Sequence, residues 1–244
     1  MSATLTYSDL VHRLIDLDRL MFAPPVGERA GLASSYDRAS SYDAANDRYL
    51  DWGANADGGG VVRMEGEDAV LAEIEGPGCI WRIWSATIGD GHVRIYLDGA
   101  SEPAVDLPFN GYFDRQHAPF DRPQLVYKTT AEGYNNYTPI SFQRSCKIVA
   151  APNWGKYYHF NYTRFAPGTR VPTFTRTLSA ADMAALDRVN AILGRAGERP
   201  TATTSATAAE ESGTLSLAAR SERVLARLEG ARVIRALRMK VALP

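Results

Sequence analysis

The sequence has too few cysteines, too little net charge and too short apolar runs for several classes of protein. Its two cysteines, Cys79 and Cys146, are too few for a disulfide scaffold and cannot form a zinc site by themselves. Its 27 basic and 28 acidic residues give a net charge of −1, which argues against a general binder of nucleic acid or anionic membranes. No apolar run reaches the roughly 20 residues that a membrane-spanning helix needs, and no signal peptide is visible. These absences predict a globular protein without a metal or other cofactor. The predicted location is cytoplasmic, with secretion as the alternative if the chain is processed or incomplete.

What the sequence does contain is a long β pattern. Between Val61 and about Phe165, short segments alternate apolar and polar residues, for example at 79–84 and 92–97. Turn residues recur about every ten positions, and no helical pattern intervenes. The pattern predicts an all-β fold, a jelly-roll sandwich with short peripheral helices. Both cysteines lie in such segments, so we expect them to be buried free thiols.

Other patterns flank the β region. Near the N-terminus, Ser8 is a candidate N-cap for a short amphipathic helix, and Ser179 is one for a second helix. Residues 34–60 are rich in Ser, Asp, Asn, Gly and aromatic residues, which predicts a long loop of functional interest. Residues 200–213 are small and polar, as is typical of an exposed linker.

The segment 224–234 echoes the segment 70–80 at a constant offset. Short β–turn–β segments share composition, so chance is one interpretation, but the constant register favours a duplication. In the second copy the sequence stops before the remaining strands, which predicts the opening of a truncated second jelly roll. We therefore predict an N-terminal helix and leader (1–30), a first jelly roll (31–175), a helix and linker (176–213), and the beginning of an incomplete second jelly roll (214–244).

An ordered set of motifs carries a family resemblance. The motifs are SSYDR (34–38), Asp51-Trp52 with Asn55, EIEGPGCIWRIWSA (73–86), VRIYLDG (93–99), PFNGYFD (108–114), YNNYTPISFQRSCKI (134–148), KYYHFNY (156–162) and APGTRV (166–171). Each motif is loose by itself, but together they span roughly residues 10–240 and resemble glycoside hydrolase family 172.

The resemblance implies a tandem pair of jelly rolls with a capsid-like topology, assembled as homo-oligomers (trimers or hexamers). Members act on α-furanosides, either fructofuranosides or arabinofuranosides, and are thought to be retaining enzymes with two glutamates in the second jelly roll. Those glutamates have no counterpart here, so we expect the N-terminal part of such an enzyme, inactive alone, with no catalytic residue of its own. Its expected partner is a carbohydrate, not nucleic acid or a membrane. The alternative is a stand-alone carbohydrate-binding or oligomer-assembly module.

Three candidate substrate-binding residues lie in the 34–60 segment. Asp51 is expected to accept a hydrogen bond from a sugar hydroxyl and not to act as a nucleophile, although most aspartates in such a loop cap turns. Trp52 is expected to form an apolar platform for a furanose, with core packing as an equally good interpretation. Asn55 belongs to the same motif.

The other four candidates lie in the β region. Strand alternation puts Arg82 and Trp84 on one face, so Arg82 lies either at a cleft or against an aromatic ring. Tyr157 and His159 also share a face, and ligand contact and structural hydrogen bonding are equally good interpretations for His159. Asn135 is a weaker candidate, because an Asn-Asn pair is typical of turns.

Overall fold

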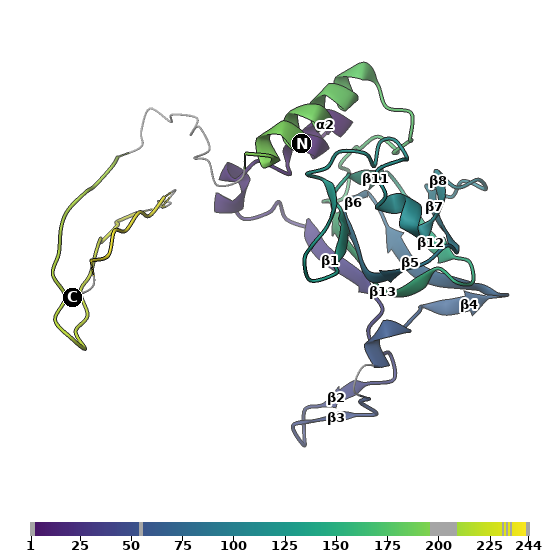
Figure 1. Cartoon of the computed structure of the whole chain (residues 1–244), viewed down its shortest axis with the longest axis horizontal. Coiled ribbons are helices and arrows are strands. Elements are labelled where there is room, and N and C mark those ends of the chain that lie inside the picture. The colour runs from purple at the N-terminus through teal and green to yellow at the C-terminus, as the bar shows by residue number, and fades with distance from the viewer. Residues whose placement is uncertain are drawn as a thin grey trace. The chain divides into compact units, whose positions relative to one another are not determined.

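The computed structural model describes residues 3–53, 56–195, 209–230, 232, 234 and 236–242. By internal contacts the chain divides into two units, Met1–Ala196 and Gly197–Pro244. The first unit contains a β-sandwich, as Figure 1 shows. None of the described helices is long and apolar enough to cross a membrane.

Two antiparallel sheets form the sandwich. The first contains, in spatial order, β1 (Arg29–Ser34), β13 (Gly155–Arg164), β6 (Gly78–Ile88), β10 (Tyr134–Asn136) and β9 (Val126–Lys128), with β11 (Ile140–Phe142) also paired to β6. The second contains β4 (Arg63–Glu65), β5 (Asp68–Glu75), β12 (Ser145–Ala150), β7 (His92–Leu97) and β8 (Val105–Pro108). Consecutive strands cross repeatedly from one sheet to the other, and the late strands β12 and β13 return to lie between early ones. The two packed sheets with few short helices form a β-sandwich, so the predicted all-β sandwich class is confirmed.

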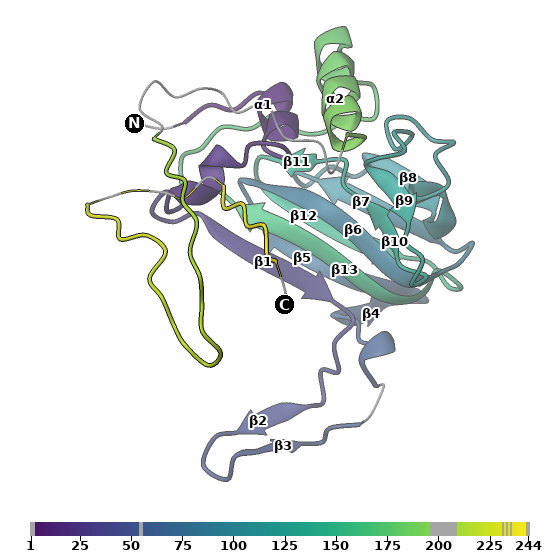
Figure 2. The ribbon, with the colours of Figure 1, turned by 60° about the vertical axis from the view of Figure 1, so that its left-hand side comes forward.

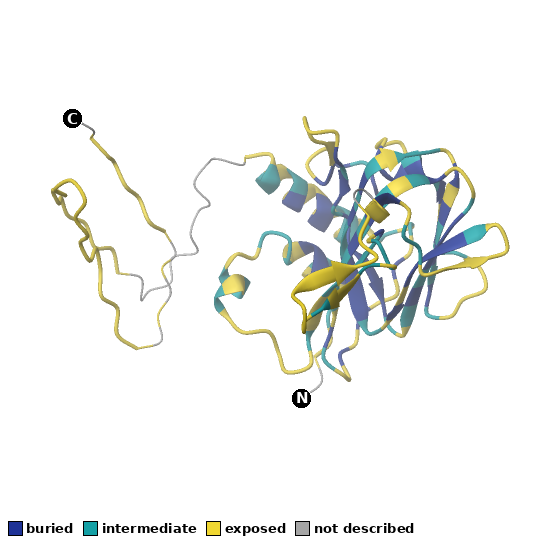
Figure 3. Ribbon diagram, turned by 90° about the horizontal axis from the view of Figure 1, so that it is seen from below, coloured by how far each residue is buried: buried dark blue, intermediate teal, exposed yellow. Residues whose placement is uncertain are grey.

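The core lies between the two sheets because their strands alternate apolar and polar residues. Along β7, for example, Val93, Ile95 and Leu97 are buried while the residues between them point outward. Figure 3 shows the buried residues gathered between the sheets and on the inner side of the helices. Cys79 and Cys146 are buried free thiols, as predicted, and burial raises the pKa of both.

Short helical elements surround the sandwich. They are α1 (Tyr7–His12), α2 (Ala180–Leu193) and the 3-10 segments η1 (Asp18–Met21), η2 (Ala56–Gly58) and η3 (Phe109–Tyr112). The predicted cap of α2 is confirmed, since the Ser179 hydroxyl accepts from the backbone N–H of Asp182 at 3.2 Å. The predicted cap of α1 is wrong: Thr6 caps this helix, with a reciprocal bond from the Thr6 backbone N–H to the Asp9 carboxylate. Ser8 instead donates from its hydroxyl to Asp182 at 2.8 Å and so joins the two helices.

A two-stranded arm leaves the sandwich after β1, as Figure 2 shows. It consists of β2 (Ser41–Asp43) and β3 (Arg48–Leu50), so the prediction of one long loop over 34–60 is wrong at these residues. The Tyr42 and Tyr49 rings face each other with centroids 5.1 Å apart, and the Tyr42 hydroxyl donates to Asp47 at 2.5 Å. Cross-strand aromatic packing of this kind stabilises a hairpin despite its polar composition.

The second unit contains no helix or strand within the residues described there, and most of those residues are exposed. The duplication and the predicted domain boundaries therefore stay predictions. The first copy of the repeat forms a strand–turn–strand, with residues in β5 and β6.

Candidate functional site

The outer face of the first sheet brings together residues that are far apart in the sequence. In the strand register His159 of β13 lies opposite Trp84 of β6, and Trp84 lies opposite Asn135 of β10. Two residues before Trp84 on β6, Arg82 lies opposite Asn161 of β13. We call the surface formed by Arg82, Trp84, Asn135 and His159, together with the neighbouring Tyr127 and Tyr137, the Arg82 face.

Arg82 is held by both polar and aromatic contacts. Its Nε donates to the Asn135 side-chain oxygen at 3.0 Å, and Asn135 is itself buried, with its amide nitrogen donating to the Gly133 carbonyl at 3.1 Å. The guanidinium carbon lies 5.8 Å from the Trp84 ring centroid and 5.9 Å from that of Tyr137. Of the two alternatives for Arg82, a cleft or an aromatic ring, the structure shows the contact with aromatic rings.

Aromatic rings make up most of the rest of the Arg82 face. Trp84 and His159 lie with ring centroids 4.6 Å apart, and the rings of Tyr127 and Tyr137 stack at 6.1 Å. The indole of Trp84 passes over Gly133, where an added Cβ would lie only 2.7 Å from Nε1, so a glycine is needed at this position.

The environment of His159 favours its neutral form. Burial, and next the positive charge of Arg82, lower the pKa of the imidazole below its usual 6.5. A neutral imidazole offers one N–H donor and one acceptor to a ligand. The Arg82 face therefore presents one cation and several neutral polar groups.

This lowered pKa predicts how stability depends on pH. The unfolded chain binds a proton at His159 more readily than the folded chain does. The contribution of His159 to the free energy of unfolding is therefore fully present above about pH 6.5 and is lost as the pH falls through the folded-state pKa. Urea unfolding of the wild type is expected to show a larger loss of stability from pH 7.5 to pH 5 than unfolding of His159→Gln. Identical pH profiles for the two proteins would contradict the lowered pKa.

The segment after β1 is tied to the first sheet. Arg38 lies over the Tyr36 ring at 4.4 Å and donates to the Ser34 carbonyl at 3.1 Å, so it ties this segment to the sheet. Tyr157, with φ at 57°, turns its ring toward Gly58 of η2, where an added Cβ would lie 2.7 Å from the ring. Tyr157 therefore packs against the end of the segment that returns from the arm.

The predicted site residues fall into two groups. Arg82, Asn135 and His159 meet on one face, with Tyr157 on the same strand as His159. Asp51 and Trp52 follow β3 on the arm, where Trp52 is 66% exposed, so core packing is not its role. Asn55 lies outside the described residues. Sequence reasoning did not select Trp84, Tyr127 or Tyr137 as site residues.

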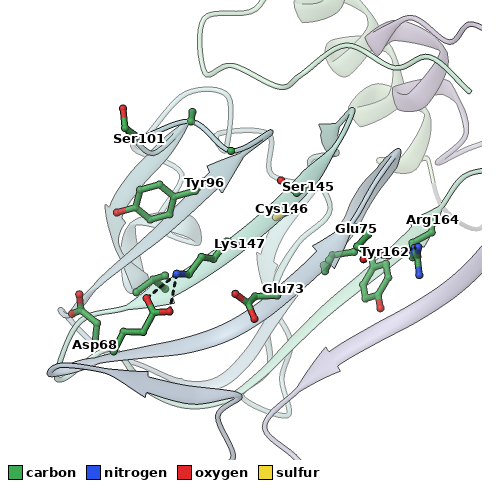
Figure 4. A pocket seen from close by; sticks show the side chains of 15 residues that line it. Asp68, Glu73, Glu75, Tyr96, Ser101, Ser145, Cys146, Lys147, Tyr162 and Arg164 are labelled. Atoms are coloured by element: carbon green, nitrogen blue, oxygen red, sulfur yellow. Dashed lines mark hydrogen bonds and ion pairs between the residues drawn. The ribbon is translucent and has the colours of Figure 1, made fainter. Parts of the chain in front are cut away.

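A hollow of about 770 Å³ lies elsewhere, on the outer face of the second sheet, as Figure 4 shows. Its carboxylates are already paired within the chain: Arg63 contacts Glu65 at 2.6 Å and Glu73 at 2.5 Å, and Lys147 contacts Glu65 at 2.7 Å. These cations lower the pKa of both glutamates, so neither is suited to donate a proton at neutral pH. The hollow contains none of the predicted site residues. Within the described part of the chain, no three side chains of metal-ligating type gather into a group.

Comparison with known proteins then assigns the family. A family model described as the GH172 first β-sandwich domain matches residues 26–182, which is more than half of the chain. The chain belongs to glycoside hydrolase family 172. No curated protein matches the sequence.

The GH172 match includes both the arm and every described strand of the sandwich. It therefore covers Asp51 and Trp52 as well as the whole Arg82 face. In this GH172 domain the two groups of predicted residues lie on separate structural elements of one matched unit, the arm and the first sheet.

Proposed function

We propose that this GH172 domain is the N-terminal jelly-roll part of a glycoside hydrolase that acts on α-furanosides, and that it binds the sugar without hydrolysing it. The observation that carries the proposal is the Arg82 face. It combines aromatic rings with polar groups whose positions are fixed by hydrogen bonds, and this combination is typical of small-ligand sites.

The chemistry of the Arg82 face suits a sugar. A furanose ring presents C–H groups that pack on aromatic rings such as Trp84, and hydroxyl groups that both donate and accept hydrogen bonds. Arg82 offers donors, and neutral His159 offers one donor and one acceptor. Because Asn135 is buried and bonded to the guanidinium at 3.0 Å, the Arg82 side chain is held in place before a ligand arrives.

The carboxylates of the domain support the proposal that it does not hydrolyse the sugar alone. A retaining mechanism needs two carboxyl groups about 5–5.5 Å apart, one of which has a raised pKa. Among the described residues, each Asp or Glu with a resolved shift has its pKa lowered, by hydrogen bonds or by cations. Following the family resemblance, we assign the nucleophile and the acid/base residue to another domain of the enzyme.

The experiment measures binding and turnover by the same preparation. Purified 244-residue chain is titrated with methyl α-D-arabinofuranoside and methyl α-D-fructofuranoside by tryptophan fluorescence, and hydrolysis of the aryl α-furanosides is followed by release of the chromophore. We expect saturable binding of at least one furanoside and no turnover. Robust turnover would overturn the proposed lack of catalysis, and absence of binding to either sugar would favour an oligomer-assembly module.

A further inference from the structure

Arg82 has no carboxylate partner among the described residues, whereas several other partly or fully buried arginines of the domain do. Arg13, Arg94 and Arg122 each lie close to an acid, at 3.7 Å from Glu28, 2.6 Å from Asp68 and 3.0 Å from Asp187 respectively. Arg82 is half-buried, yet within the described residues it forms no ion pair, and its only hydrogen bond is the one from Nε to Asn135. Such a guanidinium has lost part of its hydration without gaining an anion in exchange.

The geometry leaves the outer edge of the guanidinium available. The bond to Asn135 uses Nε, so neither Nη group is engaged by a described residue. The guanidinium carbon lies over the rings of Trp84 and Tyr137, at 5.8 and 5.9 Å from their centroids. Two Nη donors in a fixed plane match the two oxygens of a carboxylate, which arginine binds in a bidentate manner.

The charge of the surroundings indicates an anion with a single charge. Lys128, the cation on neighbouring β9, is already paired with Glu132 and lies over the Tyr134 ring at 5.1 Å. His159 stays neutral near pH 7 because its pKa is lowered. One available cation suits a monoanionic carboxylate better than a phosphate dianion, which needs several donors or cations.

We propose that Arg82 binds the carboxylate of a sugar acid, so that the Arg82 face selects furanosides bearing a carboxylate over their neutral counterparts. This inference rests on the proposed function only in taking the ligand to be a furanoside. The aromatic rings contact the sugar ring, and the Arg82 guanidinium distinguishes a ligand with a carboxylate from a neutral one.

The test uses two ligands that differ in one group. Methyl α-D-arabinofuranoside carries a C5 hydroxymethyl group, and methyl α-D-arabinofuranosiduronate carries a carboxylate in its place; sodium acetate provides the carboxylate alone. With the full chain at pH 7 we expect the uronate to bind at least tenfold more tightly than the neutral sugar, with an affinity that falls as NaCl is raised from 20 to 300 mM. In Arg82→Gln the uronate is expected to lose at least tenfold in affinity, and its advantage over the neutral sugar is expected to disappear. Arg82→Lys keeps the positive charge but not the planar guanidinium with its two Nη donors. This variant is expected to retain part of the preference for the uronate.

The outcomes separate the inference from the proposed function. Equal, salt-independent affinities for the two sugars in the wild type would overturn the inference and leave furanoside binding intact; this comparison needs no variant and holds if Arg82→Gln fails to fold. A second outcome is that the uronate binds in an Arg82-dependent way while the neutral sugar does not bind measurably. This result would support the inference and remove the evidence for neutral furanoside substrates. Acetate binding as tight as uronate binding would overturn the assignment of a sugar acid, and so would absence of binding by all three.

Discussion

Replacing Trp84 with alanine is expected to weaken furanoside binding by at least tenfold. This loss corresponds to about 1.4 kcal/mol of binding free energy. Trp84 lies between Arg82 and His159, with its ring centroid 4.6 Å from the imidazole, so its removal takes away both an apolar surface and the packing that orients two polar neighbours. The measurement is calorimetric titration of the variant with the furanoside that the wild type binds.

The matched control is Trp52→Ala on the arm. Trp52 is 66% exposed and follows β3, away from the first sheet, so the same substitution there is expected to change affinity by less than twofold. The reverse result, with loss of binding in Trp52→Ala alone, would place the sugar on the arm beside Asp51. The two variants therefore decide whether the sugar binds on the Arg82 face or on the arm.

The outward faces of single strands could be predicted from the sequence, because they depend only on local alternation. Arg82 and Trp84 were placed together correctly on this basis, and the structure finds their groups 5.8 Å apart. What could not be predicted is which strands are neighbours. Asn135 and His159 meet Trp84 from opposite sides only because β10 and β13 both pair with β6, and such long-range register has no local signal.

The arm was missed for a different physical reason. Its strands are three residues long and polar, and their composition is that of turns. The pairing depends on contacts such as that between Tyr42 and Tyr49, which are two aromatic residues among Ser, Asp and Asn. Asn135 illustrates the same point. An Asn-Asn pair in isolation is typical of turns, but here Asn135 is a buried residue of β10 whose side-chain amide is hydrogen-bonded through both its oxygen and its nitrogen.

Replacing Phe160 with alanine is expected to destabilise the sandwich more than any change on its surface. Phe160 is fully buried on β13, lies opposite Ile83 of β6, and has its ring centroid 5.4 Å from that of Tyr158. Loss of a buried phenylalanine costs about 3–5 kcal/mol, partly as transfer free energy and partly as the cavity left behind. For a domain of this size we expect the melting temperature to fall by about 6–20 °C.

The control for this prediction is Phe22→Ala. Phe22 is 72% exposed, so the same chemical change is expected to alter stability by less than about 0.5 kcal/mol. Both variants are compared with the wild type by calorimetry and by urea unfolding. Because β13 presents Phe160 to the core and its neighbours His159 and Asn161 outward, a loosened β13 should also weaken ligand binding in Phe160→Ala. Equal melting temperatures for the two variants would contradict the assignment of Phe160 to the core and, with it, the outward placement of His159.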